Sequence, residues 1–195
     1  MGCDCASQVA DLFFFWYEHK IYVLEGVDAD DPTVHCLKYA SRYIDDLNVP
    51  NINDDICESI CYDIYPDELD IIPTNSSSCK TTFLDLDISV DNGKFISKLY
   101  DKRRDFGFKV ITFPNLRSNI PNKTSYGTFI GELYRVCKSS TRCIDFIYDV
   151  KLLISKLINQ KFEKALLYSC LNRFLRSRPA CISRYWHSFK ISEFV

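Results

Sequence analysis

Two adjacent aspartates, Asp45 and Asp46, are the residues of this sequence whose type and spacing best fit a catalytic site. Apolar residues typical of a strand precede them, and Leu47 follows at once. This pattern predicts a β-hairpin with two carboxylates at its tip. Carboxylate oxygens are the ligands that Mg²⁺ prefers, and paired metal ions clamp the attacking and leaving oxygens in phosphoryl and nucleotidyl transfer.

The same pair also has a structural interpretation, because aspartate is common in turns, where its side chain caps backbone groups. Asp30-Asp31 precedes a proline and is typical of a solvated turn, and Asp54-Asp55 precedes a helical apolar pattern and is typical of a helix N-terminus. Only Asp45-Asp46 lies between strand-like apolar residues. Its context favours catalysis, but one short motif does not decide between the two interpretations.

The composition describes a folded chain with one domain, or one domain and a small second one. Of its 195 residues, 47% are hydrophobic, which is enough for a sizeable core. No apolar stretch reaches the roughly 18 residues that a membrane span needs. The 10 cysteines form no Cys-x-x-Cys pattern and there are only 3 histidines. We therefore expect reduced thiols rather than a zinc or disulfide framework, and an intracellular protein of the nucleus or cytoplasm that is not secreted.

Charge is divided unevenly along the chain. Residues 1–100 contain 6 Lys/Arg and 19 Asp/Glu, whereas residues 101–195 contain 18 Lys/Arg and 7 Asp/Glu. This division predicts an acidic front half that attracts metal ions and a basic rear half that faces polyanions. Mutual attraction between the two halves is the alternative explanation.

The elements that must position these residues follow from apolar spacing and turn signals. We predict a largely buried helix over 7–24, the aspartate hairpin over 39–49 and a short helix from Asn53. A strand is expected at 69–72, and a second hairpin over 84–100 turns at Asp91-Asn92-Gly93. The rear of the chain is predicted to form a helical bundle, and Pro179 is predicted to end this bundle. Its helices are expected at 126–138, 142–159 and 162–176.

Several segments, in one order, resemble the reverse transcriptases of eukaryotic retroelements, with the Penelope-like group as a candidate. Residues 1–13 are similar to the motif that follows Gly-x-Pro in that family, and 42–46 resemble its Tyr-x-Asp-Asp box. Residues 83–88 with 98–103 resemble the next hairpin, and 113–127 continue the similarity. The resemblance covers about residues 1–175.

The resemblance implies an α+β fold, with a partial polymerase palm at 1–112, a helical thumb-like subdomain at 113–178 and a tail of unknown role at 179–195. It implies template-directed DNA synthesis from deoxynucleoside triphosphates, usually on RNA, with two Mg²⁺ ions. Asp45 would be the principal metal ligand of this hairpin, with Asp46 in support. Tyr43 would lie near the primer end, and Gly2 would let the backbone approach the nucleotide.

The resemblance also implies that basic residues hold the backbone of the template–primer duplex, with strong dependence on salt. The candidates for these contacts are Lys102, Arg103, Arg104, Lys161, Lys164, Arg173 and Arg176.

The sequence departs from the family pattern at its beginning. The family's site needs a further carboxylate on a strand upstream of the motif in which this chain starts, and Ser7 stands where proline is usual. We therefore expect a truncated enzyme that is inactive by itself, with an apolar face exposed around Phe13 to Trp16. Two other interpretations are a non-catalytic nucleic-acid-binding module derived from a retroelement and a lipid-anchored interaction protein. Met1-Gly2-Cys3 suggests acylation, but Ala6 stands where myristoylation requires Ser or Thr.

Overall fold

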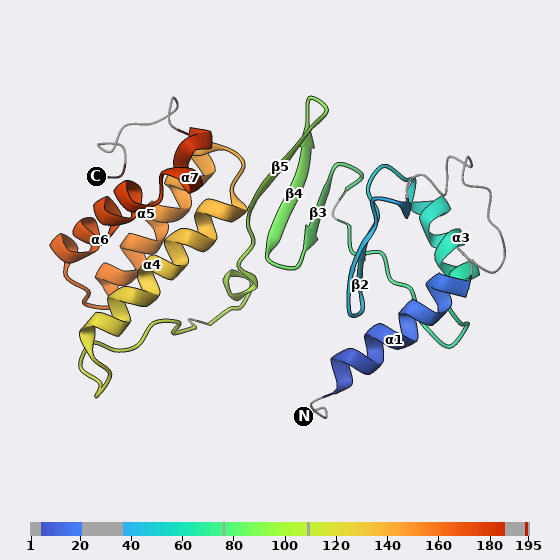
Figure 1. Cartoon of the computed structure of the whole chain (residues 1–195), viewed down its shortest axis with the longest axis horizontal. Helices are drawn as coiled ribbons and strands as arrows, with labels where there is room; N and C mark the ends of the chain where they lie inside the picture. The colour runs from blue at the N-terminus through green and yellow to red at the C-terminus, as the bar shows by residue number, and fades with distance from the viewer. Residues whose placement is uncertain (1–4, 21–36, 76, 109, 186–193, 195) are drawn as a thin grey trace. The chain divides into compact units, whose positions relative to one another are not determined.

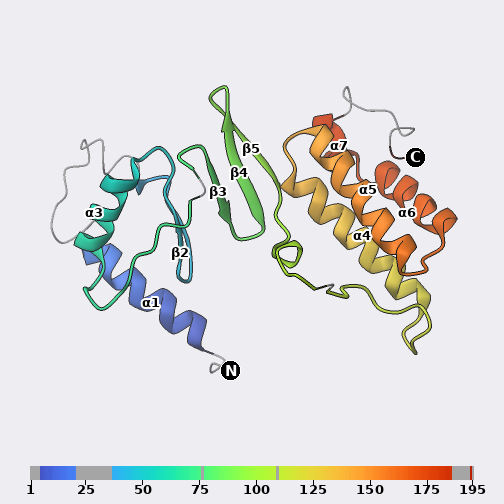
Figure 2. The same cartoon turned by 180° about the vertical axis from the view of Figure 1, so that it is seen from behind.

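The computed structural model describes residues 5–20, 37–75, 77–108, 110–185 and 194, and divides the chain into two compact units, 1–83 and 84–195 (Figure 1). The structure mixes helices with small antiparallel sheets, as the sequence predicted (Figure 2). The division between the units lies within the segment predicted as a palm, 1–112. The palm and thumb identities stay predictions.

The first unit consists of short elements around the aspartate hairpin. Strands β1 (Ser41–Tyr43) and β2 (Asp46–Asn48) pair antiparallel, as predicted. Helix α3 (Asp54–Ile64) begins where the Asn53 side chain accepts a hydrogen bond from the Asp55 amide at 2.9 Å, so Asn53 is its N-cap. This unit also contains α1 (Ala6–His19) and β3 (Lys80–Phe83).

Two expectations for the first unit were wrong. Helix α1 was predicted from its periodicity to be largely buried, but none of its residues is, and Leu12 and Trp16 are 68% and 63% exposed. This agrees with the exposed apolar face that was expected around Phe13 to Trp16 for a truncated chain. An amphipathic pattern shows that a face can be buried, whereas burial requires a neighbouring element to cover it. The strand expected at 69–72 is absent, because the Leu69 amide donates to the Pro66 carbonyl in a turn instead. Residues 21–24 of the predicted helix lie outside the described residues.

The second unit opens with the predicted hairpin. Strands β4 (Leu86–Asp91) and β5 (Lys94–Leu99) pair antiparallel, with Asp91 opposite Lys94. Asn92 and Gly93 form the two-residue turn with φ of 49° and 72°. Positive φ at both positions is the twist that suits a hairpin, and Asn-Gly is the pair that adopts it at least cost.

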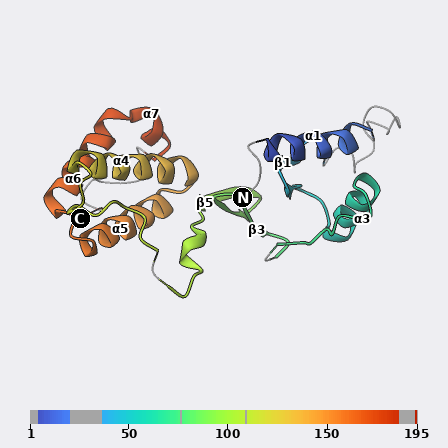
Figure 3. The same ribbon diagram turned by 90° about the horizontal axis from the view of Figure 1, so that it is seen from below.

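Three helices build the core of the second unit and confirm the predicted pattern to within a few residues (Figure 3). They are α4 (Asn122–Ser139), α5 (Cys143–Asn159) and α6 (Lys164–Ser177). Their apolar faces bury side chains that include Phe129, Leu133, Phe146, Leu157 and Leu167, each with 0% exposure. None of the helices in the described part of the chain combines the length and the apolar character needed to cross a membrane.

The prediction that Pro179 ends the helical bundle was wrong. Proline is well suited to the first position of a helix, and Pro179 begins α7 (Pro179–Ile182), which is followed by the 3-10 turn η3 (Ser183–Tyr185). Tyr185 stacks on Phe146 with ring centroids 5.4 Å apart, and Phe194 meets the same ring edge-on at 5.7 Å. The segment predicted as a tail therefore contributes to the core.

Replacing Phe146 by Ala should destabilise the second unit by about 3–5 kcal/mol, because the substitution leaves a cavity beneath both of these rings. Chemical denaturation followed by circular dichroism measures this loss. The control is Tyr148→Ala on the same helix, where the side chain is 65% exposed and the change should stay within about 0.5 kcal/mol. Equal effects of the two substitutions would contradict the assignment of the core.

Candidate functional site

The aspartate hairpin turns through Ile44 and Asp45, so that Tyr43 pairs with Asp46 across the strands. Asp45 therefore occupies the turn and Asp46 begins β2, and both side chains are exposed. Ile44 has a φ of 56°, which is unusual for a β-branched residue. Such outliers gather at functional sites, although Leu84 adopts a similar φ of 53° ahead of Asp85.

Arg42 fastens this turn to helix α1. Its Nε donates to Glu18 Oε1 at 2.7 Å, and one terminal nitrogen donates to Asp11 Oδ1 at 3.1 Å. The same nitrogen donates to the Ile44 carbonyl at 3.1 Å, and the guanidinium lies 5.0 Å from the centre of the Phe14 ring. One side chain thus joins the strained residue of the turn to two carboxylates of α1.

Tyr65, at the end of α3, completes this network by donating from its hydroxyl to Glu18 Oε1 at 2.9 Å. Burial, followed by this hydrogen bond, raises the pKa of Tyr65. Burial alone would lower the pKa of Arg42, but its hydrogen bonds to Glu18 and Asp11 raise it above the usual value. Both groups therefore keep their protons at neutral pH.

Asp45 and Asp46 line a cleft of about 310 Å³ within the first unit, together with residues of α3 and the segments before and within β3. Three further carboxylates line it: Asp54, Glu58 and Asp70. Among the described residues, however, no three His, Cys, Asp or Glu side chains are grouped so that they could hold one metal ion. Asp45 and Asp46 alone do not complete a two-metal site, and the predicted Mg²⁺ stays a prediction.

The other residues predicted near the substrate have different outcomes. Tyr43 lies on β1 directly opposite Asp46 and is 57% exposed, so its ring is accessible beside the aspartate pair. Gly2 lies outside the described residues. Cys57 was not among the predicted site residues; a hydrogen bond with Cys61 lowers the pKa of Cys57 to about 7, and the Cys57 side chain lines the aspartate cleft.

The predicted nucleic-acid contacts fall into two groups in the second unit. Arg103 and Arg104, in the 3-10 turn η2 (Lys102–Arg104), line a cavity and pair with carboxylates. The other predicted contacts have exposed side chains: Lys102, Lys161, Lys164, Arg173 and Arg176. Of these, Lys164, Arg173 and Arg176 belong to α6.

The cavity of the second unit contains the most buried charge of the described residues. Arg104 donates to Asp149 at 3.1 Å, and Asp149 is only 5% exposed. Burial raises the pKa of Asp149, and Arg104 offsets this only in part. Burial also acts to raise the pKa of Asp101, but the hydrogen bonds and charge of Arg103 outweigh it and bring the pKa below its usual value.

Comparison of the chain with protein-family models, curated proteins and solved structures returned no match. Function is therefore inferred from the residues and their geometry. Two features qualify as sites: the aspartate hairpin of the first unit and the charged cavity of the second.

Replacing Arg42 by Met should loosen the aspartate hairpin, because Glu18 loses its charged partner and the Ile44 carbonyl loses its donor. Arg42 is partly buried, so the free energy of local unfolding of the hairpin should fall by about 1–3 kcal/mol. Amide exchange in β1 and β2 should then be roughly tenfold to hundredfold faster. Hydrogen–deuterium exchange measures this directly. Lys38→Met, at an exposed residue of the same unit, is the control and should leave these amides unchanged. Unchanged exchange in Arg42→Met would show that the network does not hold the hairpin.

Proposed function

We propose that this chain is part of a reverse transcriptase, in which Asp45 and Asp46 are metal-binding carboxylates of a nucleotidyl-transfer site. The observation that carries the proposal is the aspartate pair within a Tyr-x-Asp-Asp sequence at the turn of a tight antiparallel hairpin. Two features support it: the order of the surrounding sequence motifs, and the exposure of both carboxylates toward a cleft.

Each residue of the hairpin has a stated part in this proposal. Asp45 and Asp46 supply oxygen ligands from adjacent positions, and Tyr43 lies beside them for contact with the primer end. Arg42 positions the turn through the Ile44 carbonyl. Mg²⁺, when bound, would stabilise charge on the reacting phosphate and on the leaving pyrophosphate. A further carboxylate is required beyond this pair.

The second unit supports a polyanionic partner. Residues 84–195 contain 20 Lys/Arg and 10 Asp/Glu, whereas residues 1–83 contain 4 and 16. The first unit is therefore acidic and the second basic, although the charge changes sign near residue 100, about 17 residues after the boundary between the units at residue 83. The exposed cations of α6 suit the phosphate backbone of a template–primer duplex, since such contacts release counterions and do not require base recognition.

The 195-residue chain alone is expected not to extend a primer, because two carboxylates do not supply the ligands of two metal ions. The assay supplies Mg²⁺, an RNA template with a DNA primer and deoxynucleoside triphosphates. The control is the double variant Asp45→Asn with Asp46→Asn. Synthesis by the wild type that is lost in the variant would show that the site is complete after all. Synthesis that the variant retains would remove the aspartate pair from the mechanism.

A direct test of the metal role uses Mn²⁺ as a paramagnetic substitute for Mg²⁺. The proposal expects Mn²⁺ to broaden the amide signals of residues 44–47 in the wild type and not in the double variant. No broadening at these residues would refute the metal role of the hairpin.

Binding of a template–primer duplex should weaken steeply with salt, with each phosphate contact contributing a slope of about 0.9 in log K against log salt. Replacing Lys164, Arg173 and Arg176 by Gln should reduce the slope by up to about 3. The matched control replaces three exposed cations elsewhere in the unit, Lys94, Arg117 and Lys123, by Gln and should change the slope less. Binding that does not depend on salt would contradict any role in nucleic-acid binding.

The same charge distribution favours a second candidate, a non-catalytic nucleic-acid-binding or interaction protein derived from a retroelement. Like the polymerase proposal, this candidate predicts salt-dependent binding of nucleic acid. Unlike that proposal, it predicts no metal binding at the hairpin. Salt-dependent binding together with no Mn²⁺ effect at residues 44–47 would select it.

A further inference from the structure

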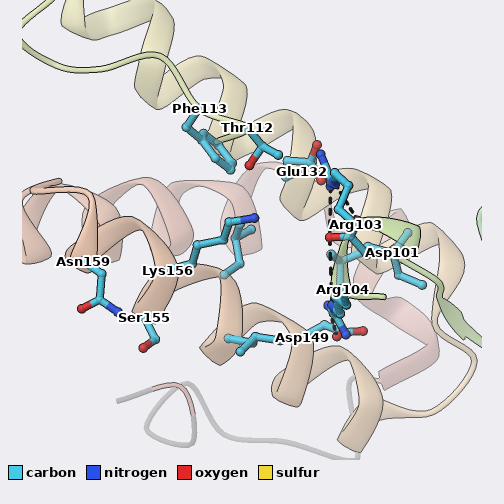
Figure 4. A pocket seen from close by; sticks show the side chains of 14 residues that line it. Asp101, Arg103, Arg104, Thr112, Phe113, Glu132, Asp149, Ser155, Lys156 and Asn159 are labelled. Carbon is cyan, nitrogen blue, oxygen red and sulfur yellow. Dashed lines mark hydrogen bonds and ion pairs between the residues drawn. The ribbon is translucent and has the colours of Figure 1, made fainter. Parts of the chain in front are cut away.

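Lys156 is a charged residue that neither the sequence motifs nor the proposed function explains. It lies on α5 and extends into a cavity of about 420 Å³ bounded by the end of β5, η2, the segment before α4, and α4 and α5 themselves (Figure 4). Six charged side chains line this cavity: Arg103, Arg104, Lys156, Asp101, Glu132 and Asp149.

The carboxylates of this cavity already have other cationic partners. Asp101 accepts two hydrogen bonds from the Arg103 side chain, at 2.5 and 3.1 Å, and Asp149 accepts one from Arg104 at 3.1 Å. Glu132 pairs with Arg135, from outside the cavity lining, at 3.5 Å.

Lys156 forms no ion pair with any described residue. Burial first, and the charge of Arg103 next, lower the pKa of Lys156, while the charges of Asp101 and Glu132 oppose this only in part.

A second unpaired group faces the same cavity. The Thr112 hydroxyl is buried and has no hydrogen-bond partner among the described residues. Figure 4 shows this oxygen and the Lys156 ammonium both directed into the cavity, from the segment before α4 and from α5. Buried polar atoms are rarely left unsatisfied, so a rotation of the Thr112 side chain that exposes its hydroxyl to a ligand in the cavity would supply the missing partner.

The apolar walls of the cavity strengthen the attraction between the Lys156 ammonium and an anion. Leu99, Phe113 and Val136 line it and are 7%, 6% and 2% exposed. Apolar walls lower the local dielectric constant, so a cation there attracts an anion more strongly than it would at the surface. The available volume exceeds that of an inorganic anion and falls in the range of small-molecule pockets.

We propose that this cavity binds a phosphate ester, with the Lys156 ammonium and the Thr112 hydroxyl as donors to the phosphate oxygens. A lysine ammonium binds phosphate as a point charge, and a threonine hydroxyl can donate to a second phosphate oxygen. Arg103 also lines the cavity, and the apolar wall accommodates the rest of the ester. The site does not depend on the polymerase proposal, because it requires neither the aspartate hairpin nor catalysis.

The test measures the thermal unfolding midpoint of the full chain with inorganic phosphate, thymidine monophosphate, thymidine or sodium chloride at constant ionic strength. A ligand of the folded state raises the midpoint in proportion to the logarithm of its concentration above its Kd. The proposal expects an increase with both phosphate compounds and none with thymidine or chloride. No increase with either phosphate compound would overturn it.

Variants identify the residues responsible. Lys156→Met should weaken the binding of thymidine monophosphate at least tenfold. Thr112→Val, which removes the hydroxyl, should weaken this binding several-fold. Lys151→Met, at an exposed lysine of the same helix, is the matched control and should bind as the wild type does. Wild-type affinity in both Lys156→Met and Thr112→Val would refute the site. If Lys156→Met fails to fold, Lys156→Gln takes its place and Thr112→Val still decides.

A final comparison distinguishes a free nucleotide from a strand end. A short single-stranded oligonucleotide with a 5′-phosphate is titrated beside thymidine monophosphate, and both titrations are repeated with Lys156→Met. Tighter binding of the mononucleotide that depends on Lys156 assigns the cavity to a free nucleotide. Tighter binding of the oligonucleotide with the same dependence assigns it to a strand end. Binding of both compounds without dependence on Lys156 would reject the cavity.

Discussion

Burial of one face of α5 is the constraint on which the second unit depends. Phe146, Val150 and Leu157 are inaccessible to solvent on this face, and Phe146 is enclosed further by Tyr185 and Phe194. The Tyr185 hydroxyl donates to the Ser140 carbonyl just before α5, so the end of the chain also fixes the start of the helix.

Once this face is fixed, the helical repeat directs a second row of side chains into the cavity. Asp149, Leu152, Leu153 and Lys156 recur at spacings of three and four residues, and all line it. The core therefore orients Lys156 and holds Asp149 where Arg104 can reach it. The charged site of the second unit is a consequence of its apolar packing.

The first unit is stabilised differently. Of its described residues, only Cys61 and Ile64 are buried apolar side chains, so packing contributes less. Arg42 provides the connection instead, with two carboxylates of α1 and the carbonyl of Ile44 as its acceptors. Such a network keeps charges available near the aspartate pair, but it depends on one side chain. The exposed face of α1, at Leu12 and Trp16, is consistent with this limited packing.

Local patterns were sufficient wherever a structure depends on neighbouring residues. The turn at Asn92-Gly93, the helices of the second unit and the hairpin at Asp45-Asp46 all follow from periodicity and turn chemistry. The same patterns failed where distant residues decide. The apolar periodicity of α1 predicted an apolar face but did not show whether another element packs against it. Pro179 signalled a break, although in the fold it starts a helix that continues the core.

The sequence by itself determined that two carboxylates stand at the turn of a hairpin and that the chain divides into an acidic and a basic part. These are properties of adjacent residues and of composition. Only the tertiary structure decided that Arg42 joins this turn to α1, that Arg104 pairs with Asp149, and that Lys156 and Thr112 line one cavity. Those relations join residues far apart along the chain, and their partners are set by how the helices and strands pack.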